Sequence, residues 1–177
     1  MASILNVDQI NNAAGTSAVT IDATTGKASF PNGATLPAGS VLQVKSVSTD
    51  VGNQGTTSTS YQELTGISLS ITPSSTSNRI LVMVSGASPY TNTGSGIIMT
   101  VYRNGTDLAG GASLGLQQNY NSAAVVHTAP YSINYLDAPA TTSAVTYKIY
   151  FRSRAGQTVY GSEAGSIPTI TAMEIAQ

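Results

Sequence analysis

The only histidine of the chain, His127, is the first residue to consider for chemistry. It lies between Ala124 and Thr128, with the apolar residues Val125 and Val126 before it. A histidine-dependent nucleophile needs a serine beside the ring and a carboxylate behind it, and an abundance of serine does not by itself supply that arrangement. We interpret His127 as an ordinary strand or loop residue, and we predict no catalytic residue.

The acidic residues are sparse, and their spacing indicates no acid–base pair. The eight of them are Asp8, Asp22, Asp50, Glu63, Asp107, Asp137, Glu163 and Glu174. Distant strands can still bring two carboxylates together for glycoside cleavage, so the sequence leaves that chemistry open. We prefer ordinary roles, with Asp137 capping a turn beside Pro139 and Asp107 following a hairpin. The chain has no cysteine, no histidine pair and no Asp-x-Asp-x-Asp-Gly loop, and we predict neither a metal site nor a cofactor.

Tyrosine is the main aromatic residue, with nine tyrosines, two phenylalanines and no tryptophan. Tyr90, Tyr120 and Tyr160 are predicted to lie in loops rich in Ser, Gly and Asn, a composition that recognition surfaces use because it combines contact area with hydrogen bonding. Subunit interfaces draw on the same residue types. These three tyrosines are therefore predicted contacts either for a receptor or for a neighbouring subunit.

The composition excludes several classes of partner. Only 8% of the residues are charged, against about 25% in ordinary soluble domains, and the net charge is -1. Nucleic acid is not expected as a ligand, because the basic residues are few and scattered. No apolar run approaches the ~20 residues that span a bilayer, so we expect no membrane insertion. The N-terminus lacks the basic and apolar blocks of a signal peptide, and we expect synthesis in the cytoplasm without export.

The residues from 41 to 177 show the pattern of β-strands separated by turns. Val145–Arg152 alternates apolar and polar residues, and Ile80–Val84 is a continuous apolar run typical of a central strand covered on both faces. Asn104-Gly105 favours a type I′ hairpin, and Tyr131–Leu136 is predicted to pair with Val145–Arg152 across the intervening loop. This region predicts one antiparallel β-sandwich.

The first forty residues differ, since their apolar clusters are too small to form a core. The clusters Ile4-Leu5-Val7, Val19-Ile21 and Phe30 are separated by turn residues, and ordering a backbone costs about 1–2 kcal/mol per residue. Such a segment needs a partner. We predict that copies of residues 1–40 wrap together or dock on another protein, with attachment contacts from Ile4, Leu5, Val7 and Ile10.

Several longer stretches carry a resemblance to a known class of protein. They are Ile4–Ile10 (ILNVDQI), Gly15–Asp22 (GTSAVTID), Phe30–Gly33 (FPNG), Leu36–Val44 (LPAGSVLQV), Ile71–Val82 (ITPSSTSNRILV) and Tyr135–Ser143 (YLDAPATTS). Together they resemble the shaft and knob of virion proteins of tailed phages, especially those of cyanophages and marine phages.

The resemblance implies a homotrimer without enzyme activity, located in the virion. The expected fold is all-β, with an intertwined trimeric β shaft in residues 1–40 and an antiparallel, jelly-roll-like β-sandwich knob in residues 41–177. The shortness of the chain favours a capsid decoration or head fibre. The alternative is a receptor-binding tail fibre that recognises host surface glycans. The expected partners are other copies of the chain and virion proteins of the capsid or tail, bound through residues 1–40.

Overall fold

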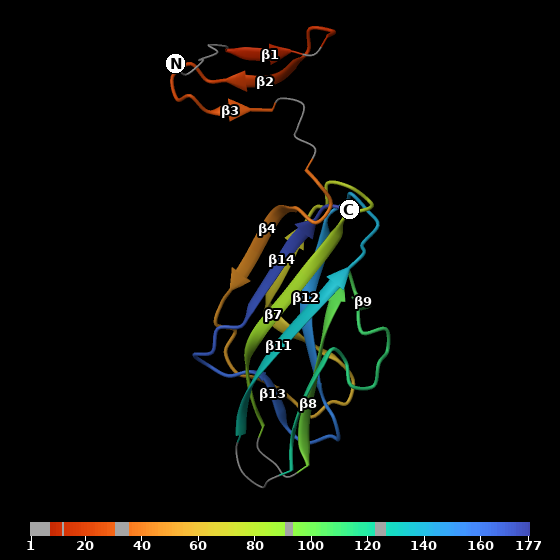
Figure 1. Ribbon diagram of the computed structural model, residues 1–177. Coiled ribbons are helices and arrows are strands. Elements are labelled where there is room, and N and C mark those ends of the chain that lie inside the picture. The colour runs from red at the N-terminus through yellow and green to blue at the C-terminus, as the bar shows by residue number, and fades with distance from the viewer. Residues whose placement is uncertain (1–7, 12, 31–35, 91–93, 123–126) are drawn as a thin grey trace. The chain divides into compact units, whose positions relative to one another are not determined.

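The computed structural model describes residues 8–11, 13–30, 36–90, 94–122 and 127–177 (Figure 1). These described residues form antiparallel β-strands and no helix. Within them, accordingly, no helix has the length and apolar character needed to cross a membrane. The chain divides into two compact units, Met1–Pro37 and Ala38–Gln177.

The first unit is a small antiparallel sheet. Its strands are β1 (Gln9–Asn11), β2 (Ser17–Ile21) and β3 (Ala28–Ser29), in the order β1-β2-β3. The turn after β2 is closed by Asp22, whose Oδ1 accepts hydrogen bonds from the backbone N–H groups of Thr24 at 3.0 Å and Thr25 at 2.6 Å. Every described residue of this unit is exposed or half-buried, so this sheet encloses no core of its own.

The second unit contains two further sheets. The five-stranded sheet consists of β6 (Gln62–Ile71), β8 (Ser95–Arg103), β9 (Thr106–Asp107), β10 (Gln117–Asn121) and β12 (Val145–Ser153), in the order β10-β8-β12-β6 with β9 paired to β8. The six-stranded sheet consists of β4 (Val41–Ser48), β5 (Gln54–Thr56), β7 (Arg79–Tyr90), β11 (His127–Asp137), β13 (Val159–Ser162) and β14 (Thr169–Ile175).

A single apolar core joins these two sheets into a β-sandwich. The predicted alternation of Val145–Arg152 is confirmed, because Val145, Tyr147, Ile149 and Phe151 are all buried while the residues between them are half-exposed. Inward residues of the six-stranded sheet meet them in the same cluster. Alternation along each strand thus assigns one face to the core and leaves the other face outward.

Strand β7 only partly fits the prediction of a strand covered on both faces. Ile80, Val82 and Val84 are 2% exposed or less and lie in the core. Leu81 and Met83, which alternate with them, are only half-buried. One face of the apolar run is therefore covered by the described chain, and the other face remains partly open.

The predicted hairpin at Asn104-Gly105 is confirmed. Both residues have positive φ angles, 47° and 86°, as a type I′ turn requires. Arg103 pairs with Thr106 across the turn.

The predicted pairing of Tyr131–Leu136 with Val145–Arg152 is wrong. β11 pairs along its full length with β7, while β12 lies between β8 and β6 in the other sheet. The connection after Asp137 crosses from one sheet to the other. Because β11 and β12 each carry one apolar face, they can enclose the core from opposite sides, and this burial outweighs the tendency of consecutive strands to pair.

The predicted role of Asp137 as a turn cap is also wrong. Asp137 is only 4% exposed, and its carboxylate accepts hydrogen bonds from Arg103 Nη1 at 2.7 and 2.9 Å and from Tyr147 OH at 2.6 Å. Burial, followed by the hydrogen bond to Asp137, raises the pKa of Tyr147. Asp137 therefore joins the two sheets near one end of the sandwich, as a paired buried charge.

A second buried carboxylate, Glu174 in β14, holds three segments together. It is fully buried, and it accepts hydrogen bonds from Ser74 N at 2.6 Å, Ser74 Oγ at 2.7 Å, Asn78 Nδ2 at 2.7 Å and Gln43 Nε2 at 2.6 Å. Burial alone would raise the pKa of this carboxyl, but the hydrogen bonds from Asn78, Gln43 and Ser74 outweigh it and hold the pKa at about 2. Glu174 thereby fixes β4 and the turn before β7 to the last strand.

We expect Glu174→Gln to lower the free energy of unfolding at pH 7 by about 1–3 kcal/mol, the cost of leaving buried donors without a charged acceptor. The pKa is lower in the folded than in the unfolded chain, so the stabilisation is complete above the ordinary value of 4.5 and is lost as the pH falls toward 2. The variant should lose less stability over that range. Urea unfolding followed by tyrosine fluorescence measures this, because all nine tyrosines lie in the second unit.

Glu163→Gln is the matched control, because the Glu163 side chain is exposed. An unfolding curve of Glu174→Gln that coincides with that of the control at pH 7 and pH 3 would contradict the stabilising role of Glu174.

Candidate functional site

Three tyrosines gather on the outer face of the five-stranded sheet. Tyr102 in β8 and Tyr150 in β12 stack with ring centroids 3.9 Å apart and an interplanar angle of 24°. Tyr61, just before β6, meets Tyr102 edge-on, with centroids 6.0 Å apart and an angle of 70°. Each ring is half-buried. The edge-on contact has a geometry favoured for aromatic pairs. Together with the stacked contact it joins the three rings into one group, which we call the tyrosine cluster.

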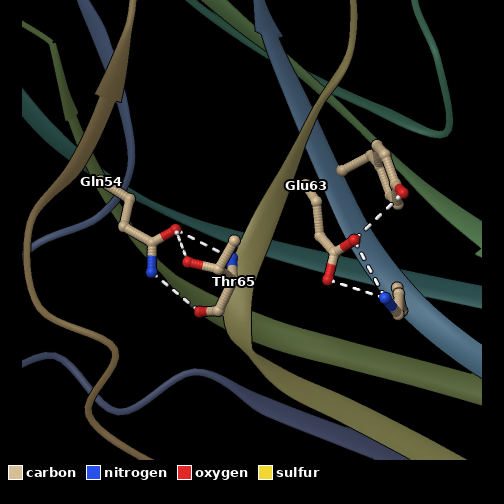
Figure 2. Close-up of polar contacts among 5 residues, drawn as sticks. Gln54, Glu63 and Thr65 are labelled. Carbon is tan, nitrogen blue, oxygen red and sulfur yellow. Dashed lines mark hydrogen bonds and ion pairs between the residues drawn. The ribbon is translucent and has the colours of Figure 1, made fainter.

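A charged pair borders the tyrosine cluster. Glu63 in β6 lies opposite Tyr150 in the register, and its Oε1 is 2.9 Å from Lys148 Nζ. Its Oε2 accepts hydrogen bonds from Lys148 Nζ at 3.0 Å and Tyr150 OH at 3.2 Å. Figure 2 shows Glu63 directed toward β12, where both donors lie. This is a partly exposed ion pair, with side-chain exposures of 39% for Lys148 and 30% for Glu63.

An irregularity in β6 places Glu63 there. On β12 the pairing passes from Lys148 to Tyr150, while on β6 it passes from Ser68 to Glu63, so β6 contains extra residues at this point. Gly66 in this bulge has a φ of 84°, which favours glycine.

The Gln54 side chain supports the bulge in the manner of a neighbouring strand (Figure 2). Its Nε2 donates to the carbonyl of Thr65 at 2.8 Å, and its Oε1 accepts from Thr65 N at 2.8 Å and Thr65 Oγ1 at 3.0 Å. Backbone groups that the bulge removes from the sheet ladder are thus satisfied by a side chain.

Arg152 completes the face and ties down the loop between β9 and β10. Its guanidinium carbon lies 5.2 Å from the centroid of Tyr61, within cation–π range. Arg152 Nη2 also donates to the carbonyl of Ser113 at 2.5 Å. A Cβ atom at Gly115 in this loop would lie 2.5 Å from the Met99 carbonyl oxygen and 2.7 Å from Tyr61 OH, so the loop can approach the sheet only with glycine there.

The electrostatics of this face suit binding better than proton transfer. Burial raises the pKa of Tyr61, Tyr102 and Tyr150, and the hydrogen bond to Glu63 raises the pKa of Lys148. At neutral pH the hydroxyls are therefore protonated and the ammonium is charged. Aromatic rings beside hydroxyl, ammonium and carboxylate groups match a polar, polyhydroxylated ligand.

The segment Gly111-Ala112-Ser113-Leu114-Gly115 has the Gly-x-Ser-x-Gly spacing of a hydrolase nucleophile elbow. Its structure is different, because an elbow joins a strand to a helix and this segment is a loop between two strands. His127 is an exposed residue that begins β11 in the other sheet. In the described ranges no three His, Cys, Asp or Glu side chains gather as a metal site.

The prediction that the three contact tyrosines lie in loops is wrong, because all three lie in strands. Tyr120 lies in β10 opposite Gly96, 50% exposed, with the Arg154 guanidinium carbon 4.6 Å from its ring centroid. Tyr160 lies in β13 opposite Gly55, and its half-buried ring packs on that glycine.

Tyr90 is the last residue of β7, where its backbone pairs with β11 and β13. Tyr120 is the last but one residue of β10. None of the predicted three belongs to the tyrosine cluster.

Of the predicted attachment residues, Ile4, Leu5 and Val7 lie outside the described residues. Ile10 lies in β1 and is 48% exposed.

The sequence did not predict the tyrosine cluster, only the outward face of one strand that contributes to it. The alternation of Val145–Arg152 places Lys148, Tyr150 and Arg152 on the outward face. Glu63 lies beside these residues because of the bulge in β6. The sequence signal for this bulge is Gly66. The position of Tyr102 depends on which strand pairs with β12, and the sequence carries no local signal for that.

Comparison of the sequence with protein-family models finds no matching family, and comparison with curated proteins finds no matching relative.

We expect Glu63→Gln to lower the pKa of Lys148, since removing the carboxylate charge removes the interactions that raise it. NMR titration of ¹³C-labelled lysine side chains measures this. The chain has only three lysines, Lys27, Lys45 and Lys148, so the signals can be assigned by substitution. Glu163→Gln should leave the Lys148 titration unchanged. An identical Lys148 titration in wild type and Glu63→Gln would mean that the ion pair does not form in solution.

Proposed function

We propose that this chain is a non-enzymatic structural protein of a phage particle and acts as a homotrimer. Residues 1–40 would join the copies to one another and to the particle. The observation that best supports this is a formed sheet without buried side chains in the first unit. Ile10 is 48% exposed there and Phe30 is 52% exposed. Such a sheet gains too little from apolar burial to offset an ordering cost of about 1–2 kcal/mol per residue.

Association with other chains would supply the missing burial. Several copies of the segment can enclose their apolar clusters together, and β1 and β3 at the sheet edges can pair with further strands. A trimer is the state that the resemblance to phage shaft proteins implies. Ile4, Leu5, Val7 and Ile10 remain the proposed contacts with the particle.

The second unit would be the part presented outward. It has its own core and needs no burial from the first unit. We favour capsid decoration or a head fibre as its role. A copy number per particle that is a large multiple set by the capsid lattice is expected for this role, and a small number set by the tail would support a tail fibre.

A receptor-binding tail fibre is the second candidate, and the tyrosine cluster favours it. Stacked rings beside Lys148 and Glu63 offer the mixture of aromatic and hydrogen-bonding groups that sugar ligands need. Tyr120 in β10, which is 50% exposed, adds a second contact.

We expect a double variant, Ile10→Asn with Phe30→Ser, to fold in its second unit but to be lost from assembled particles. Both side chains are exposed, so the substitutions remove apolar contact area without disturbing a core. Quantitative mass spectrometry of purified particles measures incorporation. Ile167→Asn with Leu114→Asn is the control, because these residues are 61% and 51% exposed in loops of the second unit. Incorporation of the double variant at the control level would contradict the proposed role of residues 1–40.

If the second candidate holds, the full chain should bind host surface polysaccharide, and Tyr150→Ala should weaken this binding at least tenfold by removing a stacked ring (about 1.4 kcal/mol or more). Biolayer interferometry on immobilised polysaccharide measures this binding. Tyr120→Ala tests the second contact separately, and Ile167→Asn is the control. The receptor-binding role fails if wild-type protein does not bind, whereas the structural role does not depend on this result.

A further inference from the structure

The outer face of the six-stranded sheet carries a regular, uncharged grid of side chains. β4, β14, β7 and β11 lie side by side (Figure 1), and three rows of outward residues run across all four strands in register. Ile175 of β14 and Arg79 of β7 form a further pair just beyond these rows. The three rows of the grid are Val44–Met173–Leu81–Leu136, Ser46–Thr171–Met83–Asn134 and Ser48–Thr169–Ser85–Ser132. We call the first of these the apolar row.

The apolar row is open to solvent at both of its ends. Val44 is 54% exposed and Leu136 is 52% exposed, while Met173 and Leu81 between them are half-buried. Val41, at the start of β4, is also 49% exposed and extends the apolar surface. A soluble monomer seldom leaves such a contiguous apolar surface uncovered.

The rest of the grid is neutral and already hydrogen-bonded in part. Ser46 Oγ lies 2.8 Å from Thr171 Oγ1, and Ser48 Oγ lies 2.8 Å from Thr169 Oγ1. No grid position holds a charged residue. The nearest charge on this face is Arg79, which is exposed in the next row beyond Leu81. Covering the grid itself would therefore bury no charge and would leave few polar groups in need of new partners.

The sequence of β7 also indicates that its outward face packs against something outside the described chain. Its run Ile80–Val84 is apolar on both faces, as in strands that lie between two layers. Within the described chain only the inward face is enclosed, and Leu81 and Met83 remain half-buried.

We propose that this face packs against the same face of two further copies of the chain around a threefold axis. The proposal rests on the homotrimer of the proposed function and identifies the surface through which the knobs meet. The uncharged grid suits a second copy of itself, because no like charges confront each other across it and Arg79 lies at its margin, where it can stay in water. Acidic or basic partners would find no complementary charge on the grid.

The size of the face explains why copies would need the N-terminal segment as well. Four strands about 4.8 Å apart and about seven residues long cover roughly 450 Å² in projection, short of the ~800 Å² per partner of a standard stable interface. Gly39 N and Ser40 O bond to Ala176 at the end of the sheet where β4 begins. Copies joined through residues 1–37 would thus hold their apolar rows at high effective concentration.

This arrangement predicts one specific contact. Val44 and Leu136 lie at opposite ends of the apolar row, so around a threefold axis Val44 of one copy lies beside Leu136 of the next. Within one copy they are separated by three strand spacings, about 14 Å, beyond the ~7 Å between Cα atoms that a disulfide can bridge. A bridge between these two positions can therefore form only between copies.

The test uses the full chain, which contains no cysteine of its own. We expect the double variant Val44→Cys with Leu136→Cys to form a covalent trimer under mild oxidation, seen on a non-reducing denaturing gel. Each single variant should give no covalent trimer, and neither should the control pair Leu114→Cys with Ile167→Cys. As a second test, Val44→Lys with Leu136→Lys should raise the apparent dissociation constant of the trimer by on the order of tenfold or more, because like charges are brought together. Tyrosine fluorescence checks that each variant folds.

The outcomes separate this proposal from the one on which it rests. If wild type sediments as a trimer but the double cysteine variant stays uncrosslinked and the lysine variant dissociates like wild type, this face is not the contact and the homotrimer stands. If wild type sediments as a monomer, both proposals fail.

Discussion

The register of β7 is the constraint on which the second unit depends. β7 pairs with β14 along one edge, with β13 at its last residue and with β11 along the whole other edge. Its alternation decides which residues of those partners face the core, since a shift by one residue would exchange the two faces of every strand paired to it. The observed register buries Ile80, Val82 and Val84 in the core. Glu174 stabilises this register by accepting hydrogen bonds from the turn that precedes β7.

The two outer faces of the sandwich have different chemistry. The five-stranded sheet presents the tyrosine cluster with Glu63, Lys148 and Arg152, and these groups remain in contact with water. The grid on the six-stranded sheet carries no charge. Such a division fits a molecule that uses one face for assembly and keeps the other free, because apolar burial favours association and hydrated charges oppose it.

Local features of this fold were predictable from sequence, and non-local ones were not. The alternation of Val145–Arg152 and the Asn104-Gly105 turn depend on residues close together, and both predictions are confirmed. The partner of Tyr131–Leu136 was predicted wrongly, because an alternating pattern states which face is buried but not which strand lies alongside. Asp137 was misassigned for a similar reason, since its partner Arg103 lies far away in sequence. The tyrosine cluster was not predicted, because the position of Tyr102 beside Tyr150 depends on strand order. The position of Glu63 beside the cluster depends on the bulge in β6.

The central claim is that this chain is built to work as several copies, with the first unit lacking a core because other chains complete it. Sedimentation equilibrium of the intact protein over a wide concentration range tests this most directly. We expect a mass of about 54 kDa for the intact protein, three times the chain mass of 18.1 kDa. Deletion of residues 1–37 should shift the equilibrium toward the monomer. A full-length protein that stays at 18.1 kDa at every concentration would contradict it.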